Sequence, residues 1–165
     1  MLLLAGCGSS PAGPELAPPA KARTYRLGWI EHYRSAHFTF RVERVAVTAE
    51  GWQAKVAVDN NSKTAFRLAE RSAGLVLLDT HKRSEIRRLT GDLQHPPPAL
   101  KPDRISPEPP PALGPGASWS ATISGGEILR HGSVVRVLFG PFSSIERYRA
   151  ETEDVQWVTD HSIRI

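Results

Sequence analysis

Residues 38–58 read FTFRVERVAVTAEGWQAKVAV, and this stretch decides the fold class. Apolar and polar side chains alternate from Phe38 to Val47, with one slip that predicts a β-bulge near Glu43 or Arg44. A period of two is typical of a strand that buries one face. After a glycine turn the alternation resumes, so the stretch predicts a hairpin whose apolar faces share one core.

The same period continues through most of the chain. Further strands are expected at 66–68, 75–78, 86–89, 119–123, 135–139, 155–157 and 163–165. Short helical turns are predicted only at 126–130 and 143–150. Seven to nine strands in this order predict an all-β fold, an antiparallel β-sandwich with a disordered N-terminal tether.

Proline interrupts this pattern in one place. Nine of the fourteen prolines lie between residues 96 and 115. Proline lacks a backbone N–H and favours the polyproline II conformation. The segment therefore predicts a long proline-rich loop that does not pair into a sheet.

Composition sets the broad class of the protein. The 165 residues carry a net charge of +4 and 40% hydrophobic side chains, which suits one globular domain. A single cysteine excludes an intramolecular disulfide. The positive charge is small and scattered, so we expect no nucleic-acid partner. No apolar run approaches the roughly 18 residues that a spanning helix needs, so any membrane attachment requires a lipid or a partner.

The first residues suggest such a lipid. An apolar run ends in Leu4-Ala5-Gly6-Cys7, which resembles the lipobox of bacterial lipoproteins. The resemblance implies cleavage before Cys7 and acylation of Cys7, with residues 1–6 as the end of a signal peptide. No basic residue precedes the short apolar run, so we expect the true start codon upstream of Met1.

Residues 7–23 are rich in Pro, Gly and Ser and predict a tether, followed by a sandwich domain over residues 24–165. The expected location is the cell envelope. Gly8, not aspartate, follows the cysteine, which favours the periplasmic face of the outer membrane in a Gram-negative source. In a Gram-positive source, the expected location is the outer surface of the cell membrane.

A second resemblance concerns the domain itself. The block from Val45 to Leu78 contains the pattern V-x-V-x-N-x-S, and Leu113-Gly114-Pro115-Gly116 follows later. This order is similar to that of immunoglobulin-like domains in small bacterial lipoproteins. The resemblance implies an antiparallel immunoglobulin-like β-sandwich with a binding or structural role, and it carries no catalytic residues.

Histidine is the obvious candidate for chemistry. Asp79 with His81, and Asp160 with His161, could each offer two ligands to a metal, which leaves a small metal-binding or enzymatic envelope protein as an alternative. No paired ligand spacing occurs, so we expect no metal, cofactor or catalytic site. Asp160-His161-Ser162 is rejected as a hydrolase triad, since adjacent strand residues point to opposite faces. The six histidines are His32, His37, His81, His95, His131 and His161.

Two further features suggest a partner. The densest basic cluster could contact an anionic partner or could keep a hairpin edge soluble; it contains Lys82, Arg83, Arg87 and Arg88. The proline-rich loop at 96–115 could serve a protease-inhibitor-like module, because a rigid loop loses little entropy on binding.

The four tryptophans could in principle form a carbohydrate platform. Trp52, Trp119 and Trp157 each fall on an apolar parity, which predicts core packing, whereas Trp29 is uncommitted. The favoured function is therefore a lipid-anchored, non-catalytic envelope lipoprotein that presents its domain to an unknown envelope protein or polymer. We expect no small-molecule substrate.

Overall fold

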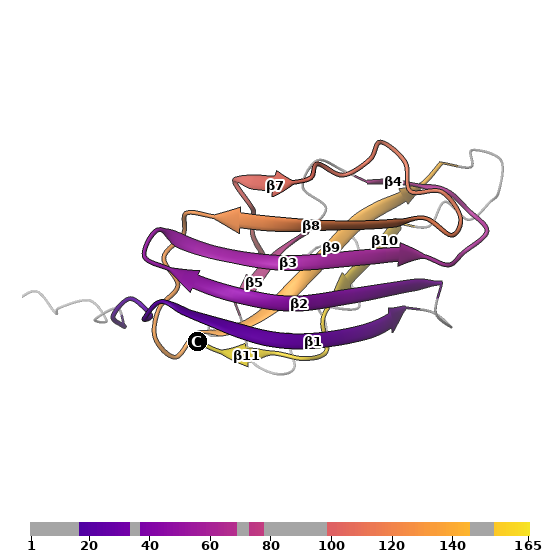
Figure 1. Ribbon diagram of the computed structural model, residues 1–165. Coiled ribbons are helices and arrows are strands. Elements are labelled where there is room, and N and C mark those ends of the chain that lie inside the picture. The colour runs from indigo at the N-terminus through magenta and orange to yellow at the C-terminus, as the bar shows by residue number, and fades with distance from the viewer. Residues whose placement is uncertain (1–16, 34–36, 69–72, 78–98, 146–153) are drawn as a thin grey trace, which may run out of the picture.

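The computed structural model describes residues 17–33, 37–68, 73–77, 99–145 and 154–165. In these ranges the chain forms eleven strands and no helix. The strands make two antiparallel sheets (Figure 1), which confirms the predicted all-β sandwich. The strand count exceeds the expected seven to nine because several strands are only two or three residues long.

The first sheet has five strands in the order β1-β2-β3-β8-β7. Its two edges are therefore the long strand β1 and the short strand β7. The bounds are β1 (Arg23–Tyr33), β2 (Phe38–Thr48), β3 (Gly51–Asn60), β8 (Ser118–Gly125) and β7 (Arg104–Ser106).

The second sheet is organised around β9 (Val134–Ser144), which runs obliquely behind the first sheet in Figure 1. The strand order β10-β9-β5-β6 forms its main path, and β4 and β11 also pair with β9. The bounds are β4 (Phe66–Leu68), β5 (Ala73–Leu77), β6 (Ala99–Leu100), β10 (Asp154–Val158) and β11 (Ile163–Arg164).

The core lies between the two sheets and is rich in aromatic rings. The ring centroids of Phe40 on β2 and Phe139 on β9 lie 4.8 Å apart, and those of Phe38 and Phe142 lie 5.9 Å apart. Such stacked pairs add to the burial energy of both sheets. The predicted inward positions are buried throughout: Phe38, Phe40, Val42, Val45, Val47, Trp52, Ala54, Val56, Val58, Trp119, Ala121, Ile123, Val135, Val137 and Phe139.

The predicted bulge in β2 is confirmed. The register between β2 and β3 shifts between Val42 and Arg44, which leaves Glu43 without a cross-strand partner. The extra residue lets Val42 and Val45 both face the core, although three positions separate them.

The prediction that residues 96–115 do not pair is wrong. Within this segment, β6 pairs with β5 and β7 pairs with β8. Both pairings use the non-proline stretches between the prolines, and β7 lies at a sheet edge, where a missing N–H costs least.

Two smaller predictions also differ from the structure. Residues 126–130 form no helix, and residues 143–144 continue β9. The expected strand at 86–89 lies outside the described residues. Pro19 forms an isolated bridge with Arg130, so contact with the sandwich begins before the expected domain boundary at residue 24.

Glycine is required where β3 begins. Gly51 has a φ of 139°, and a Cβ there would overlap the carbonyl oxygen of Gly125. Gly51→Ala should lower the free energy of unfolding by about 3 kcal/mol, because left-handed backbone costs about 1–2 kcal/mol and overpacking costs about 1–3 kcal/mol. Gly28 has a φ of 60° with open space around it, so Gly28→Ala should lose only about 1 kcal/mol. Equal urea midpoints for the two variants would contradict the expected overlap between a Cβ at residue 51 and the carbonyl oxygen of Gly125.

Across the described ranges, no helix is long and apolar enough to cross a membrane.

Candidate functional site

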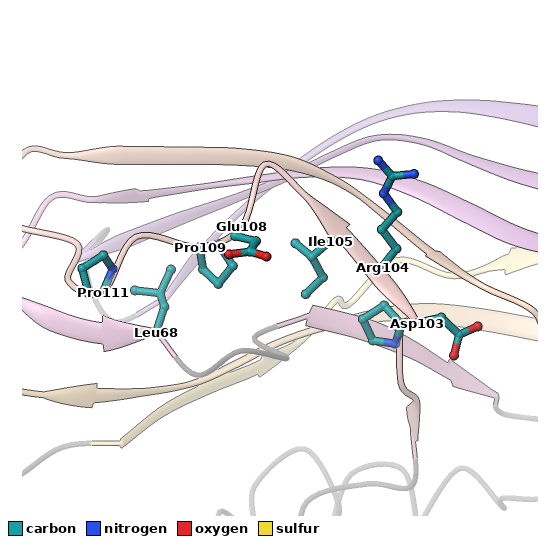
Figure 2. Close-up of a pocket in the computed structure, with 8 residues that line it drawn as sticks. Leu68, Asp103, Arg104, Ile105, Glu108, Pro109 and Pro111 are labelled. Carbon is teal, nitrogen blue, oxygen red and sulfur yellow. The ribbon is translucent and has the colours of Figure 1, made fainter.

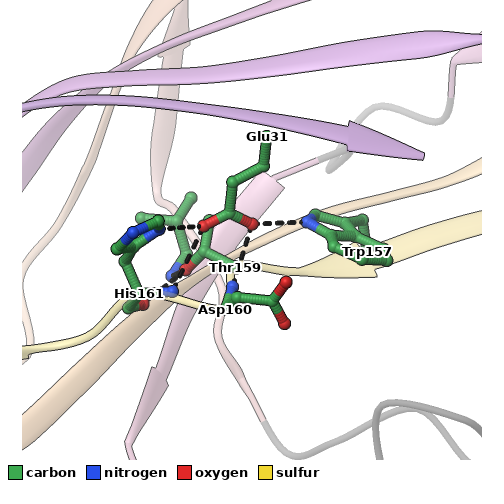
Figure 3. Close-up of polar contacts among 6 residues, drawn as sticks. Glu31, Trp157, Thr159, Asp160 and His161 are labelled. Carbon is green, nitrogen blue, oxygen red and sulfur yellow. Dashed lines mark hydrogen bonds and ion pairs between the residues drawn. The ribbon is translucent and has the colours of Figure 1, made fainter. Parts of the chain in front are cut away.

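One buried carboxylate joins the two sheets at the β1 edge. Glu31 on β1 lies on the inward parity between Trp29 and Tyr33, and its residue exposure is 6%. Its side chain extends to the segment that follows β10, where it meets Trp157, Asp160 and His161 (Figure 3). Together with Trp29, these residues are here called the Glu31 cluster.

Both oxygens of Glu31 accept hydrogen bonds. Oε2 accepts from the indole Nε1 of Trp157 at 2.7 Å and from the backbone N–H of Asp160 at 2.9 Å. Oε1 accepts from the backbone N–H of His161 at 3.2 Å and lies 2.7 Å from its Nδ1. The carboxylate therefore satisfies donors from a segment about 130 positions away in the chain.

Thr159 holds the same segment onto the second sheet. Its hydroxyl donates to the carbonyl of His161 at 3.0 Å and accepts from the backbone N–H of Val137 at 3.0 Å. Glu31 thus contacts a turn that is itself hydrogen-bonded to β9. This arrangement ties the β1 edge of one sheet to the centre of the other.

These contacts change the acidity of Glu31. Burial by itself raises the pKa of the carboxyl group. Hydrogen bonds from the His161 ring, the Trp157 indole and the backbone N–H groups of Asp160 and His161 outweigh burial, and the pKa is lowered from its ordinary value of 4.5. Glu31 is therefore ionised at neutral pH. An ionised carboxylate only accepts hydrogen bonds, so Nδ1 of His161 is the donor in its contact with Oε1.

The lowered pKa predicts a dependence of stability on pH. A carboxyl group with a lower pKa in the folded state stabilises the fold above its unfolded pKa, and this stabilisation is lost as the pH falls through the folded value. The urea midpoint should therefore fall steadily below about pH 4.5. Glu31→Gln removes the titrating group, so its midpoint should fall less steeply over the same pH range. Parallel curves for the two proteins would show that Glu31 does not contribute.

The exposed side of the Glu31 cluster is aromatic. Trp29 stacks on the imidazole of His161, with ring centroids 5.5 Å apart and an interplanar angle of 26°. The side chain of His161 is 59% exposed, and no described residue is hydrogen-bonded to its Nε2. A carboxylate-oriented imidazole is a component of hydrolase and metal sites, but each also needs a nucleophile or further ligands.

A groove of about 610 Å³ lies along β7, at the opposite edge of the five-stranded sheet from the Glu31 cluster. Figure 2 shows Leu68, Pro109 and Ile105 side by side, with Asp103 toward one end and Pro111 toward the other. The wall therefore combines apolar side chains, three of them prolines, with the charged side chains of three further residues. The lining residues are Leu68, Pro102, Asp103, Arg104, Ile105, Glu108, Pro109 and Pro111.

The pattern V-x-V-x-N-x-S has a structural explanation. Asn60 is completely buried, and its amide nitrogen donates to the carbonyls of Thr64, Leu113 and Gly114 at 2.8–3.1 Å. Its amide oxygen accepts from the N–H and hydroxyl of Ser62. The asparagine thus ties the end of β3 to Leu113–Gly114, the later motif of the same resemblance.

Comparison of the chain with protein-family models, with curated proteins and with solved structures gave no match. The resemblances to lipoproteins and to immunoglobulin-like domains therefore stay predictions, and the geometry of the described residues carries the argument.

Most of the predicted site residues lie outside the described residues. They are Cys7, Asp79, His81, Lys82, Arg83, Arg87, Arg88 and His95. Of the described histidines, His32 contacts the hydroxyl of Thr39, and His37 and His131 are exposed. Over the described ranges, no three His, Cys, Asp or Glu side chains form a group that could hold a metal ion.

The aromatic predictions are partly confirmed. Trp52 and Trp119 are buried in the core, as expected. Trp157 packs against the core but is only half-buried, because its indole N–H turns toward Glu31.

Sequence reasoning missed Glu31 itself. Its position on the inward parity of Trp29 and Tyr33 was the available signal, since a carboxylate there needs buried donors.

Proposed function

We propose that the chain is a lipid-anchored, non-catalytic protein of the bacterial cell envelope whose sandwich binds a partner through the groove along β7. The single observation that carries the binding role is that groove, which lies along β7, an edge strand of the five-stranded sheet in the described residues. Its volume of about 610 Å³ falls within the range of ligand-binding clefts. The proposed lipid anchor rests on Leu4-Ala5-Gly6-Cys7.

The lining of the groove suggests what it binds. Pro109, Pro111 and Ile105 offer apolar surface. The groove also carries one positive charge, on Arg104, and two negative charges, on Asp103 and Glu108. Proline walls lose little conformational freedom when a partner binds, which lowers the cost of association. An apolar segment of an envelope protein, with polar groups at its ends, fits this chemistry.

The Glu31 cluster supports the non-catalytic part of the proposal. Of the buried polar residues in the described ranges, Glu31 is the charged one, and its two oxygens are occupied by four hydrogen bonds within the fold. A general base must instead have a free lone pair within reach of the substrate. Glu31 serves the packing of the sheets.

The anchor is tested by Cys7→Ser. Wild-type protein expressed from its natural upstream region should fractionate with membranes and carry acyl mass on Cys7. The variant should lose both properties, because serine lacks the thiol that is acylated and a stable anchor needs at least two lipid signals. Intact-mass analysis and fractionation measure the two properties separately. Wild-type protein that retains residues 1–6 and stays in the soluble fraction would contradict the anchor.

The binding role is tested by placing a photo-crosslinking amino acid at Glu108, which is exposed and lines the groove. A discrete adduct with an envelope protein is expected in living cells. The same label at Ser120, exposed on the outer face of β8, serves as the control. The groove would lose its assigned role if both positions gave the same products, or if Glu108 gave none.

One observation favours a second candidate, a protease-inhibitor-like module. Residues 107–112 are held at both ends, by the pairing of β7 with β8 and by the two backbone hydrogen bonds between Leu113 and Phe66. A segment held in this way could present itself to a protease with little loss of entropy. Replacing 107–112 by a Gly/Ser linker should abolish inhibition of a sensitive envelope protease. Unchanged inhibition would exclude this candidate.

A further inference from the structure

The outward face of β1, β2 and β3 carries a row of three cations. Arg26 on β1 lies opposite Arg44 on β2, and Arg44 lies opposite Lys55 on β3. Directly opposed residues share one face of a sheet, and like charges there are destabilising. Arg26 and Arg44 are exposed, and neither forms an ion pair with a described residue. Their charges are therefore available to an external anion.

The carboxylates on this face already form ion pairs within the fold. Glu43 lies 2.7 Å from Nζ of Lys55, and Asp59 lies 2.6 Å from the guanidinium of Arg41. These two ion pairs are neutral overall. The remaining net charge of the face comes from Arg26 and Arg44.

The same face exposes a large apolar side chain. Ile30 on β1 lies opposite Arg41 and is 60% exposed, more than any other large hydrophobic residue in the described ranges. Several further outward positions on β2, β3 and β8 carry short side chains; these are Ala46, Ala57, Ser120 and Thr122. This face therefore combines an exposed apolar side chain with two arginines that form no ion pair with a described residue.

We propose that this face, formed by the outward residues of β1–β3, binds the surface of an anionic phospholipid bilayer. Arg26 and Arg44 would contact lipid phosphates, and Ile30 would enter the headgroup region. Basic residues near an anionic bilayer gain affinity from its surface potential, and exposed apolar residues gain affinity from burial at its interface. A soluble polyanion would complement the arginines but would leave Ile30 in water.

The proposal deepens the proposed function. It rests on the lipid anchor to bring the domain close to a bilayer, whereas the affinity of this face for anionic lipid does not depend on the anchor. Arg26 and Ile30 both lie on β1, the strand that begins directly after the expected tether. A domain held by Cys7 would therefore carry this face beside the bilayer, and the groove along β7 lies at the far edge of the same sheet.

The test uses the full chain with Cys7→Ser, so that lipidation plays no part in it. Co-sedimentation with vesicles of phosphatidylglycerol and phosphatidylcholine should exceed that with phosphatidylcholine alone. Arg26→Glu with Arg44→Glu should weaken binding to the mixed vesicles by about 30-fold or more, since each basic residue contributes about fivefold. The matched control is Arg67→Glu with Lys101→Glu, two exposed residues outside this face. It makes the same change in net charge and should retain most of the binding.

Two results would overturn the proposal. The first is an equal loss in both double variants, which would mean that net charge alone drives binding. The second comes from Ile30→Ser, which should weaken vesicle binding and leave heparin binding unchanged. If Ile30→Ser changes neither, while Arg26→Glu with Arg44→Glu abolishes heparin binding, the face is a site for soluble polyanions. Because Cys7 is absent throughout, these outcomes are independent of whether the native chain is acylated.

Discussion

Glu31→Ala should lower the free energy of unfolding by about 3–5 kcal/mol, because several hydrogen-bond donors lose their acceptor at once. The variant removes the acceptor for the Trp157 indole and for the backbone N–H groups of Asp160 and His161. Each donor left unsatisfied in a part-buried site costs about 1–3 kcal/mol. The measurement is the free energy of unfolding from urea denaturation at neutral pH.

Glu43→Ala is the matched control, since it removes a glutamate from the neighbouring strand. Its ion pair with Lys55 is exposed, with side-chain exposures of 50% and 40%, so the loss should stay below about 1 kcal/mol. The fluorescence of Trp157 gives a second readout, because its indole would gain access to water when Glu31 is removed. Similar losses in the two variants would mean that the Glu31 cluster does not join the sheets.

Asn60→Ala should lower the free energy of unfolding by about 3 kcal/mol. The side chain has no exposed surface and makes five hydrogen bonds with Ser62, Thr64, Leu113 and Gly114. Alanine cannot replace any of these hydrogen bonds. The carbonyl oxygens of Leu113 and Gly114 would each lose a hydrogen-bond donor where little water can replace it. The loss should also be visible as faster hydrogen exchange at the N–H of Phe66, which donates to the carbonyl of Leu113.

Two comparisons isolate the cause of this loss. Asn60→Asp keeps the size of the side chain but turns an oxygen toward three carbonyl oxygens, so it should destabilise the protein more than Asn60→Ala. Asn61→Ala changes an exposed neighbour whose side chain donates to Thr39, and it should cost less than about 1 kcal/mol. If Asn60→Asp proved milder than Asn60→Ala, the hydrogen bonds to the carbonyls would be of minor importance.

The Glu31 cluster and the hydrogen bonds of Asn60 stabilise the fold without occupying the two surfaces that are proposed to bind partners. Glu31 and its donors close the β1 edge against the second sheet, and Asn60 fixes the start of the segment that leads from Leu113 into β8. The groove lies at the opposite edge, along β7. The outward face of β1–β3 carries Arg26 and Arg44, which form no ion pair within the described ranges. Stability and binding are therefore assigned to separate residues, which makes their variants separable by experiment.

The sequence by itself determined the class of the fold and most of its core. The alternation in residues 38–58 predicted the β2–β3 hairpin, the bulge beside Glu43 and the buried positions on both strands. These features follow from the side-chain period of a strand, which is a local property of the chain. The same local reasoning failed for residues 96–115, since proline content alone does not reveal that β7 finds a partner in β8.

Only the tertiary structure decided which distant residues meet. Glu31 and His161 are 130 positions apart, and Asn60 and Leu113 are 53 positions apart, so no local pattern connects them. Arg26, Arg44 and Lys55 form a row only because the register of three strands places them side by side. Register and sheet packing depend on the summed burial of all strands, and a single segment read alone does not contain that information.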